Sequence, residues 1–98
     1  MSKKESKFQA EFIKNWRKEH PDDLIGKVDF QQGIPDVVIL HNDRHALLEF
    51  KDSADAKHQP NQDYYVAREN AKSFAAFIYP ENEEVVRREL YSALGIER

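Results

Sequence analysis

The sequence contains no cysteine, only three glycines and four prolines, and no long apolar run. Without cysteine, a disulfide framework, a thiolate metal site and a cysteine nucleophile are all excluded. The apolar stretches are much shorter than the ~20 residues that a membrane-spanning helix needs, so no membrane partner is expected and a cytoplasmic location fits. No glycine-rich phosphate loop is present, which excludes an NTPase.

The charges that are present are unevenly distributed along a single predicted domain, residues 1–98. The net charge of −3 is not typical of a nucleic-acid-binding domain, which is commonly basic. Residues 1–18 nevertheless hold six Lys or Arg against two acids, whereas the rest of the chain is acidic. This segment is either a solvated helix face or a patch that contacts phosphates. Its basic residues are Lys3, Lys4, Lys7, Lys14, Arg17 and Lys18, and the first three are our candidates for DNA contact.

Hydrophobic spacing predicts an α/β fold with the element order α-β-β-β-α-β followed by a C-terminal helix. The four strands should form one mixed sheet flanked by helices. Pro60 suits the first turn of the second helix, and Gly95 suits the end of the last one. The predicted helices are 5–19, 61–72 and 81–94, and the predicted strands are 24–30, 34–40, 45–51 and 73–79.

The second and third predicted strands should form a hairpin with its turn at residues 42–43. If residues 41 and 44 pair, Asp36 lies directly opposite Glu49, with both side chains on one face of the sheet. Because side chains alternate along a strand, Glu49 and Lys51 also share a face. The sequence therefore predicts two carboxylates and an ammonium group close together.

Two carboxylates facing each other among apolar residues need an offsetting charge, because both repulsion and burial disfavour their ionised forms. Mg²⁺ would offset them, since it takes oxygen ligands from one or two carboxylates and keeps positions for water and phosphate. Lys51 could then hold the attacking water or stabilise the phosphate. The set has the outline of a phosphodiester-hydrolysis site. Alternatively, Glu49 and Lys51 simply face solvent on an edge strand.

A more specific pattern surrounds these residues. Residues 33–36 read Gly-Ile-Pro-Asp and are followed by an apolar run, and residues 48–51 read Leu-Glu-Phe-Lys, so that 12 residues separate Asp36 from Glu49. This pattern resembles the PD-(D/E)XK nuclease superfamily, and the predicted α-β-β-β-α-β order is similar to its restriction-endonuclease-like core. The chain looks most like the small phage-type nucleases and the virus-type replication-repair nuclease group, which are related to Holliday-junction resolvases.

The resemblance implies a Mg²⁺-dependent DNA endonuclease in which Mn²⁺ can substitute. It implies that Asp36, Glu49 and the backbone carbonyl of Phe50 bind the metal and that Lys51 assists the water. It also implies that Gln62, at the start of the second helix, contacts the site or the DNA, although Gln62 could equally be an ordinary early-helix residue. A location in phage or bacterial host cytosol follows from the same resemblance.

Many members of the superfamily also carry an acid on the first helix. At about 100° per residue, Glu5 and Gln9 fall on the same side as the apolar residues of that helix, whereas Glu11 points away. Glu5 and Gln9 are therefore the candidates for this contribution. A glutamine would depart from the acidic pattern of the family, and Glu5 could instead be a frayed terminal residue.

Residues beyond the motif could contact DNA as well. Lys57 and His58 lie in the loop after the third predicted strand, where His58 either touches phosphate, carries a proton or is an ordinary surface histidine. Tyr64 and Tyr65, at helical spacing with Arg68, either stack on nucleobases or pack into the core.

The sequence thus predicts a metal-dependent DNA endonuclease, with branched or junction DNA among its candidate substrates. A homodimer would suit such an enzyme, because resolving a junction requires two symmetric cuts. The alternative is a catalytically inactive nuclease-fold module that binds DNA or serves in an assembly. The complete set of Asp36, Glu49 and Lys51 argues against that alternative, and the uncertain first-helix acid argues for it.

Overall fold

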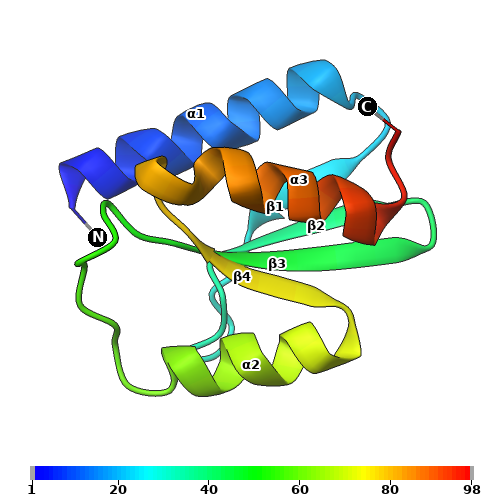
Figure 1. The fold of residues 1–98 in the computed structure, drawn as a ribbon. Helices are drawn as coiled ribbons and strands as arrows, with labels where there is room; N and C mark the ends of the chain where they lie inside the picture. Colours follow the sequence, from blue (N-terminus) through cyan, green and yellow to red (C-terminus); the bar gives the residue numbers. More distant parts are fainter. Residues whose placement is uncertain (1, 98) are drawn as a thin grey trace.

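The computed structural model describes residues 2–97 as an α/β fold, in which a four-stranded mixed sheet is flanked by helices (Figure 1). The element order predicted from the sequence, including the C-terminal helix, is confirmed. A short 3-10 turn at Pro80–Asn82 precedes the last helix. The elements are α1 (Lys3–Glu19), β1 (Leu24–Lys27), β2 (Val37–His41), β3 (Arg44–Phe50), α2 (Gln62–Lys72), β4 (Phe74–Ile78) and α3 (Glu83–Leu94).

The strands lie in the order β1-β2-β3-β4, antiparallel from β1 to β3 and parallel between β3 and β4. The connection from β3 to β4 passes through α2 and returns the chain to the end of the sheet at which β3 begins. Strand β4 therefore runs parallel to β3. In the β2–β3 hairpin, His41 pairs with Arg44 and Val37 pairs with Leu48. The predicted hairpin register is therefore correct.

The hydrophobic core lies between the sheet and the helices α1 and α3, while α2 covers the opposite face (Figure 1). Helix α1 contributes the fully buried Trp16, whose indole N–H donates to Asp23 Oδ2 at 3.0 Å. This bond satisfies the one polar atom of a large buried ring. The core comprises Phe12, Ile13 and Trp16 of α1, Val86, Leu90 and Leu94 of α3, and Ile25, Val37, Ile39, Ala46, Leu48, Phe50 and Ile78 of the sheet.

The first strand is shorter than the sequence predicted. It ends at Lys27, and Phe30, expected as a strand residue, is 76% exposed. Residues 28–36 instead form a loop whose ends are joined by a hydrogen bond from Val28 N–H to the Asp36 carbonyl. Strand β2 correspondingly begins at Val37 rather than at residue 34. The pattern of apolar residues in this segment was therefore not sufficient to predict whether it forms a strand or a loop.

The helix ends also refine the prediction. Helix α1 begins at Lys3 rather than near residue 5, because the Ser2 hydroxyl accepts the Glu5 N–H and caps the first turn. Pro60 lies before the N-cap of α2, Asn61, and so outside the first turn. Gly95, with φ of 74°, ends α3 as predicted. No helix within residues 2–97 is long and apolar enough to cross a membrane.

Candidate functional site

A polar cavity of about 430 Å³ lies where the start of α1 meets the ends of β2 and β3 and the loop that leads to α2. Its lining contains four carboxyl groups and two lysines. The excess of carboxyl groups would repel a polyanion unless a cation were bound in the cavity. The lining residues are Ser2, Glu5, Asp36, Glu49, Lys51, Asp52, Ala56, Lys57, Gln59 and Gln62. Six of them were predicted from the sequence: Asp36, Glu49, Lys51 and Gln62 as site residues, Glu5 as a first-helix candidate and Lys57 as a candidate for DNA contact.

Glu49 enters this cavity from β3, and Asp36 enters it from the last position of the loop that leads into β2. Both lie one position beyond the paired Val37 and Leu48, which puts them opposite each other. Asp36 is held in place because its Oδ2 accepts the Phe50 N–H at 3.1 Å. Glu49 is only 2% exposed, so its carboxyl group is enclosed by the protein.

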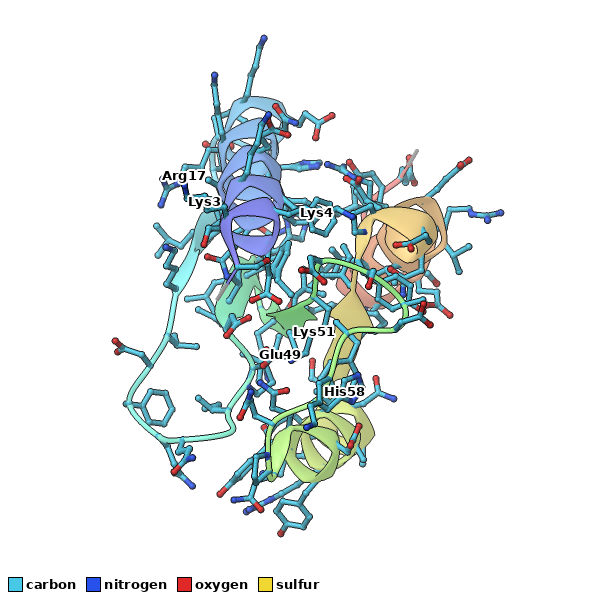
Figure 2. The ribbon with its side chains drawn as sticks, turned by 90° about the vertical axis from the view of Figure 1, so that its left-hand side faces the viewer. Lys3, Lys4, Arg17, Glu49, Lys51 and His58 are labelled. Carbon is cyan, nitrogen blue, oxygen red and sulfur yellow. The ribbon has the colours of Figure 1, made fainter. Side chains whose placement is uncertain are left out.

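Gln62 links the other members of the site (Figure 2 labels Glu49 and Lys51). Its Oε1 accepts from Lys51 Nζ at 2.7 Å, and its Nε2 donates to Glu49 Oε2 at 3.1 Å. Lys51 Nζ also donates to the Lys57 carbonyl at 3.2 Å, and the side chain is 5% exposed. The amide of Gln62 thus fixes the positions of a carboxyl group and an ammonium group at once.

Burial and neighbouring charges raise the pKa values of two acids of the cavity, Glu49 and Glu5. Burial, reinforced by the Asp36 carboxylate, raises the pKa of Glu49 to about 9, and the Lys51 ammonium only partly opposes this. Partial burial likewise raises the pKa of Glu5, against the same opposing effect of Lys51. Without a bound cation, these effects favour the neutral form of Glu49.

The donor atoms of the cavity fit a hard divalent cation. Glu49 Oε1 is buried and has no hydrogen-bond partner of good geometry in the structure. Such an orphaned oxygen, beside the Asp36 carboxyl group, is the kind of ligand that Mg²⁺ takes, with water and phosphate completing its shell. Within residues 2–97, no three His, Asp or Glu side chains are grouped so that they could hold a metal by themselves. The fit is thus to a two-carboxylate Mg²⁺ or Mn²⁺ site rather than to a closed structural one. The Phe50 N–H donates to Asp36, and the metal-binding role of the Phe50 carbonyl remains a prediction.

The first helix presents the residues that its periodicity predicted. Glu5 reaches the cavity and sits in a capped first turn, so it is not a frayed terminal residue. Gln9 is 1% exposed, and neither its Oε1 nor its Nε2 has a hydrogen-bond partner. Glu11 is exposed, as expected. Of the two first-helix candidates, only Glu5 lines the cavity.

The lysines predicted to contact DNA are all exposed. Lys3 and Lys4 flank the start of α1, the end of the helix that lies above Glu49 and Lys51 in Figure 2. Lys7 is exposed one turn further along. Arg17, in contrast, donates to the Ile25 carbonyl at 2.9 Å and so fastens α1 to β1. The basic segment therefore divides into free lysines and one structural arginine.

Lys57 and His58 have different surroundings. Lys57 lines the cavity, and its carbonyl accepts from Lys51. The His58 ring stacks on Phe77 with the ring centroids 4.0 Å apart, and its Nδ1 is 2.8 Å from Asp63 Oδ1. His58 is not part of the cavity lining. Its contacts fix the loop against the sheet and α2.

Sequence reasoning missed four residues of the cavity lining: Ser2, Asp52, Ala56 and Gln59. Ser2 donates to Asp52 Oδ2 at 2.9 Å and so ties the start of α1 to the loop after β3. Gln59 donates its N–H to Gln62 Oε1 at 2.8 Å. Ser2 could have been found, because a serine three residues before a glutamate is a helix N-cap pattern. Nothing local in the sequence marks Asp52 or Gln59.

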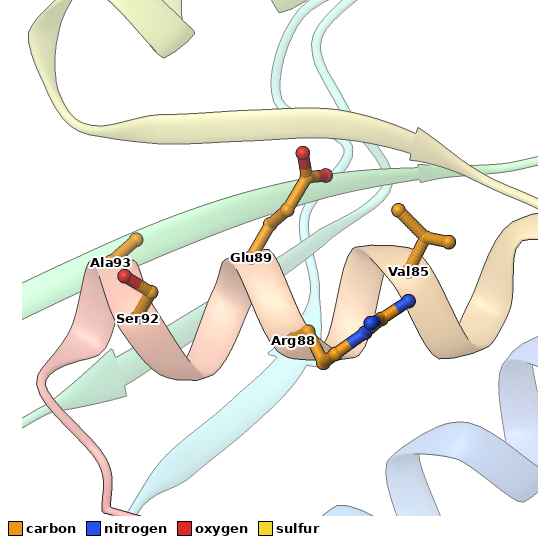
Figure 3. Close-up of a pocket in the computed structure, with 5 residues that line it drawn as sticks. All are labelled: Val85, Arg88, Glu89, Ser92 and Ala93. Carbon is orange, nitrogen blue, oxygen red and sulfur yellow. The ribbon is translucent and has the colours of Figure 1, made fainter.

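Two other hollows are less suited to chemistry. One of about 590 Å³ lies along the exposed side of α3 and is lined by Val85, Arg88, Glu89, Ser92 and Ala93 (Figure 3). Another, of about 470 Å³, lies between α1 and β1, and its charged lining residues are all basic. Neither combines paired carboxylates with a lysine, so the cavity at Asp36 and Glu49 is the candidate site.

Comparison of the chain with protein-family models, with curated proteins and with solved structures finds no match. The resemblance to the PD-(D/E)XK nucleases therefore remains a prediction that depends on the chain's own motif. The arguments for a function come from the geometry of the cavity.

Proposed function

We propose that the protein is a divalent-metal-dependent nuclease that hydrolyses phosphodiester bonds in DNA. The observation that carries the proposal is the joint placement of Asp36, Glu49 and Lys51 in one cavity, with Gln62 bonded to two of them. A buried carboxyl group that faces a second carboxyl group and has a raised pKa is costly in a purely structural role. Binding a cation would remove that cost.

Each side chain has a distinct part in the proposed reaction. A divalent cation held by Asp36 and Glu49 would supply Lewis-acid activation of the phosphate and of the attacking water. Gln62 orients Glu49 and Lys51, and the Lys51 ammonium stabilises negative charge that develops on the phosphate. The water oxygen bonds to phosphorus and loses a proton to solvent in the cavity. The bond to the leaving sugar oxygen breaks, and that oxygen takes up a proton.

The exposed lysines at the start of α1 would contact phosphates beside the scissile bond. This local positive charge suits DNA as the partner, although the whole chain is acidic. Branched or junction DNA, two copies of the chain acting together and a location in phage or bacterial host cytosol belong to the same proposal. The proposed substrate, the pair of copies and the location all rest on the resemblance of the sequence motif to that of the PD-(D/E)XK nucleases.

The test is a cleavage panel. Linear duplex, nicked, flap and four-way-junction DNA, together with matched RNA, are incubated with the protein in Mg²⁺, Mn²⁺ or EDTA. We expect cleavage with either metal and none in EDTA. Asp36→Asn, Glu49→Gln and Lys51→Ala should each reduce the rate at least about 100-fold, as the loss of a general-acid–base or electrostatic group does.

Asp43→Asn is the matched control, because Asp43 is an exposed carboxylate in the hairpin turn of the same two strands. It should cleave at the wild-type rate. Full activity in EDTA, or wild-type rates in two of the three site variants, would refute the nuclease proposal.

A module that binds DNA without cutting it is the second candidate. It is favoured by the engagement of Lys51, whose ammonium is bonded to Gln62 and to the Lys57 carbonyl rather than to a carboxylate. Metal-independent DNA binding without cleavage of any substrate would support this candidate.

A further inference from the structure

The loop between β3 and α2 forms hydrogen bonds to the candidate site on both sides of His58. On one side, the Lys57 carbonyl accepts from Lys51 Nζ at 3.2 Å. On the other side, the Gln59 N–H donates to Gln62 Oε1 at 2.8 Å. Lys51 and Gln62 are also bonded to each other at 2.7 Å. The main chain next to His58 therefore helps to set where the ammonium group and the amide group of the site lie.

The side chain of His58 holds this part of the loop in place. Its ring stacks on Phe77 of β4, with the ring centroids 4.0 Å apart and the planes 15° from parallel. Its Nδ1 lies 2.8 Å from Asp63 Oδ1 of α2. Figure 2 shows His58 between the labelled Lys51 and helix α2. His58 thus connects the loop to the sheet and to the helix.

Of these two contacts, the stacking on Phe77 is the one that holds the ring. The side chains of His58 and Asp63 are 35% and 75% exposed, and a pair so open to water contributes little to stability. The stacked rings bury apolar surface, and this contact needs no charge. Phe77 pairs with Glu49 of the neighbouring strand, so the two side chains lie on the same face of the sheet. The ring of His58 is therefore fixed beside the site without lining the cavity.

We propose that His58 is a positioning residue. Its ring, stacked on Phe77, holds the adjacent main-chain groups where they orient Lys51 and Gln62. The role requires an aromatic ring and no proton, so it differs from phosphate contact and from proton transfer. The effect on cleavage rests on the proposed nuclease function, because Lys51 acts on the phosphate there. The effect on the hydrogen bonds does not depend on that function.

The first experiment measures the hydrogen bonds themselves in the metal-free protein. Nuclear magnetic resonance follows the exchange with water of the Lys51 ammonium protons and of the Gln59 amide proton. His58→Ala removes the ring, whereas His58→Phe keeps a ring that can stack but cannot carry a proton. His45→Ala is the matched control, because His45 is exposed near the start of β3 and the cavity lies at the other end of that strand.

We expect both exchange rates to rise at least about tenfold in His58→Ala, because the loop opens more often without its stacked ring. His58→Phe and His45→Ala should keep the wild-type rates. Phe77→Leu should act like His58→Ala, and the double variant should add little to either, because the two rings form one contact. Circular dichroism melts check that the fold is intact. Wild-type exchange rates in His58→Ala, or equally fast exchange in His58→Phe and His58→Ala, would overturn the positioning role.

The second experiment measures DNA cleavage by the same variants in Mg²⁺. His58→Ala should lower kcat about tenfold, because a misplaced Lys51 stabilises the transition state less well. KM should stay unchanged, since no contact that binds the DNA before reaction is removed. His58→Phe should restore kcat. A raised KM with an unchanged kcat in His58→Ala would identify a DNA contact instead, and loss of cleavage in His58→Phe with normal exchange would identify a chemical role for the imidazole. Either result would refute the proposal.

The two experiments separate this inference from the function on which it partly rests. If the wild type cuts no substrate but exchange still depends on the ring at position 58, the nuclease fails and the positioning role stands. If the wild type cuts DNA, and His58→Ala matches it in both cleavage and exchange, the positioning role is refuted and the nuclease stands.

Discussion

Asp36 and Glu49 lie opposite each other at the open end of the β2–β3 hairpin, and the Asp36 carboxylate contributes to the raised pKa of Glu49. The main-chain bond from Phe50 to Asp36 fixes one carboxyl group, and the bond from Gln62 to Glu49 fixes the other. Neither group can turn away to relieve the repulsion. The fold therefore holds two acids in a geometry that is unfavourable when both are ionised and favourable when a cation lies between them.

The pH dependence of stability should reveal this arrangement. The folded-state pKa of Glu49 is raised from 4.5 to about 9, so the folded protein holds a proton that the unfolded chain has released between these values. The contribution of Glu49 to stability without metal should be greatest below the lower value and fall as pH rises to about 9, by at most ~1.4 kcal/mol per pH unit. Urea unfolding in EDTA from pH 5 to 9 measures this change in the free energy of unfolding. Glu49→Gln should flatten the profile, and a profile with the wild-type slope in this variant would contradict the assignment.

Asp36→Asn should stabilise the metal-free protein at neutral pH, because it removes the charge that repels Glu49 while keeping an oxygen that can accept from Phe50. Mg²⁺ at ten times its Kd should stabilise the wild type by ~1.4 kcal/mol, or roughly 6–11 °C in Tm for a domain of this size. The variant should gain almost nothing. Thermal melts of both proteins in EDTA and in Mg²⁺ measure these shifts. A variant that gains as much from Mg²⁺ as the wild type does would show that the two acids are not one metal site.

Replacing Lys3, Lys4 and Lys7 by Gln should weaken DNA binding about equally for all sequences. Each lost phosphate contact should flatten the log–log salt dependence by up to ~0.9. Replacing Lys14 and Lys18 is the control, because these exposed lysines lie more than about 10 Å further along α1 from the cavity. Binding titrations at several salt concentrations give the slopes. Equal slopes for the wild type and the triple variant would mean that the lysines at the start of α1 lie on an ordinary solvated helix face and do not contact DNA.

Gly33→Ala should destabilise the protein by about 1–3 kcal/mol, because its φ of +89° strains any side chain and the new Cβ would meet Asn61. The loop that carries Phe30 and positions Asp36 should shift with it. Gly26→Ala is the matched control, since its Cβ would meet no atom within 4 Å, and it should change stability by less than about 1 kcal/mol. Chemical denaturation of the two variants compares them directly. Equal stabilities would mean that the loop does not pack on α2 as described.

Much of the site could be predicted because its geometry follows from the regular periodicity of strands and helices over short stretches of the sequence. Alternation along β3 put Glu49 and Lys51 on one face, and the short turn after His41 set the register that brings Asp36 opposite Glu49. Helical periodicity separated Glu5 and Gln9 from the exposed Glu11. These relations involve neighbours in the chain or strands joined by a two-residue turn, so the backbone geometry alone imposes them.

Tertiary structure decided what depends on residues far apart in the sequence. Phe30 lies on an exposed loop rather than in a strand, and Gly33 of the same loop packs against Asn61, a residue distant in the sequence. Arg17 became structural because α1 crosses β1 at Ile25. The sequence by itself determined which groups face one another across the hairpin. The pKa of Glu49 and the bonds through Gln62 were decided by the folded chain, because burial and a contact between α2 and β3 exist only once distant segments pack together.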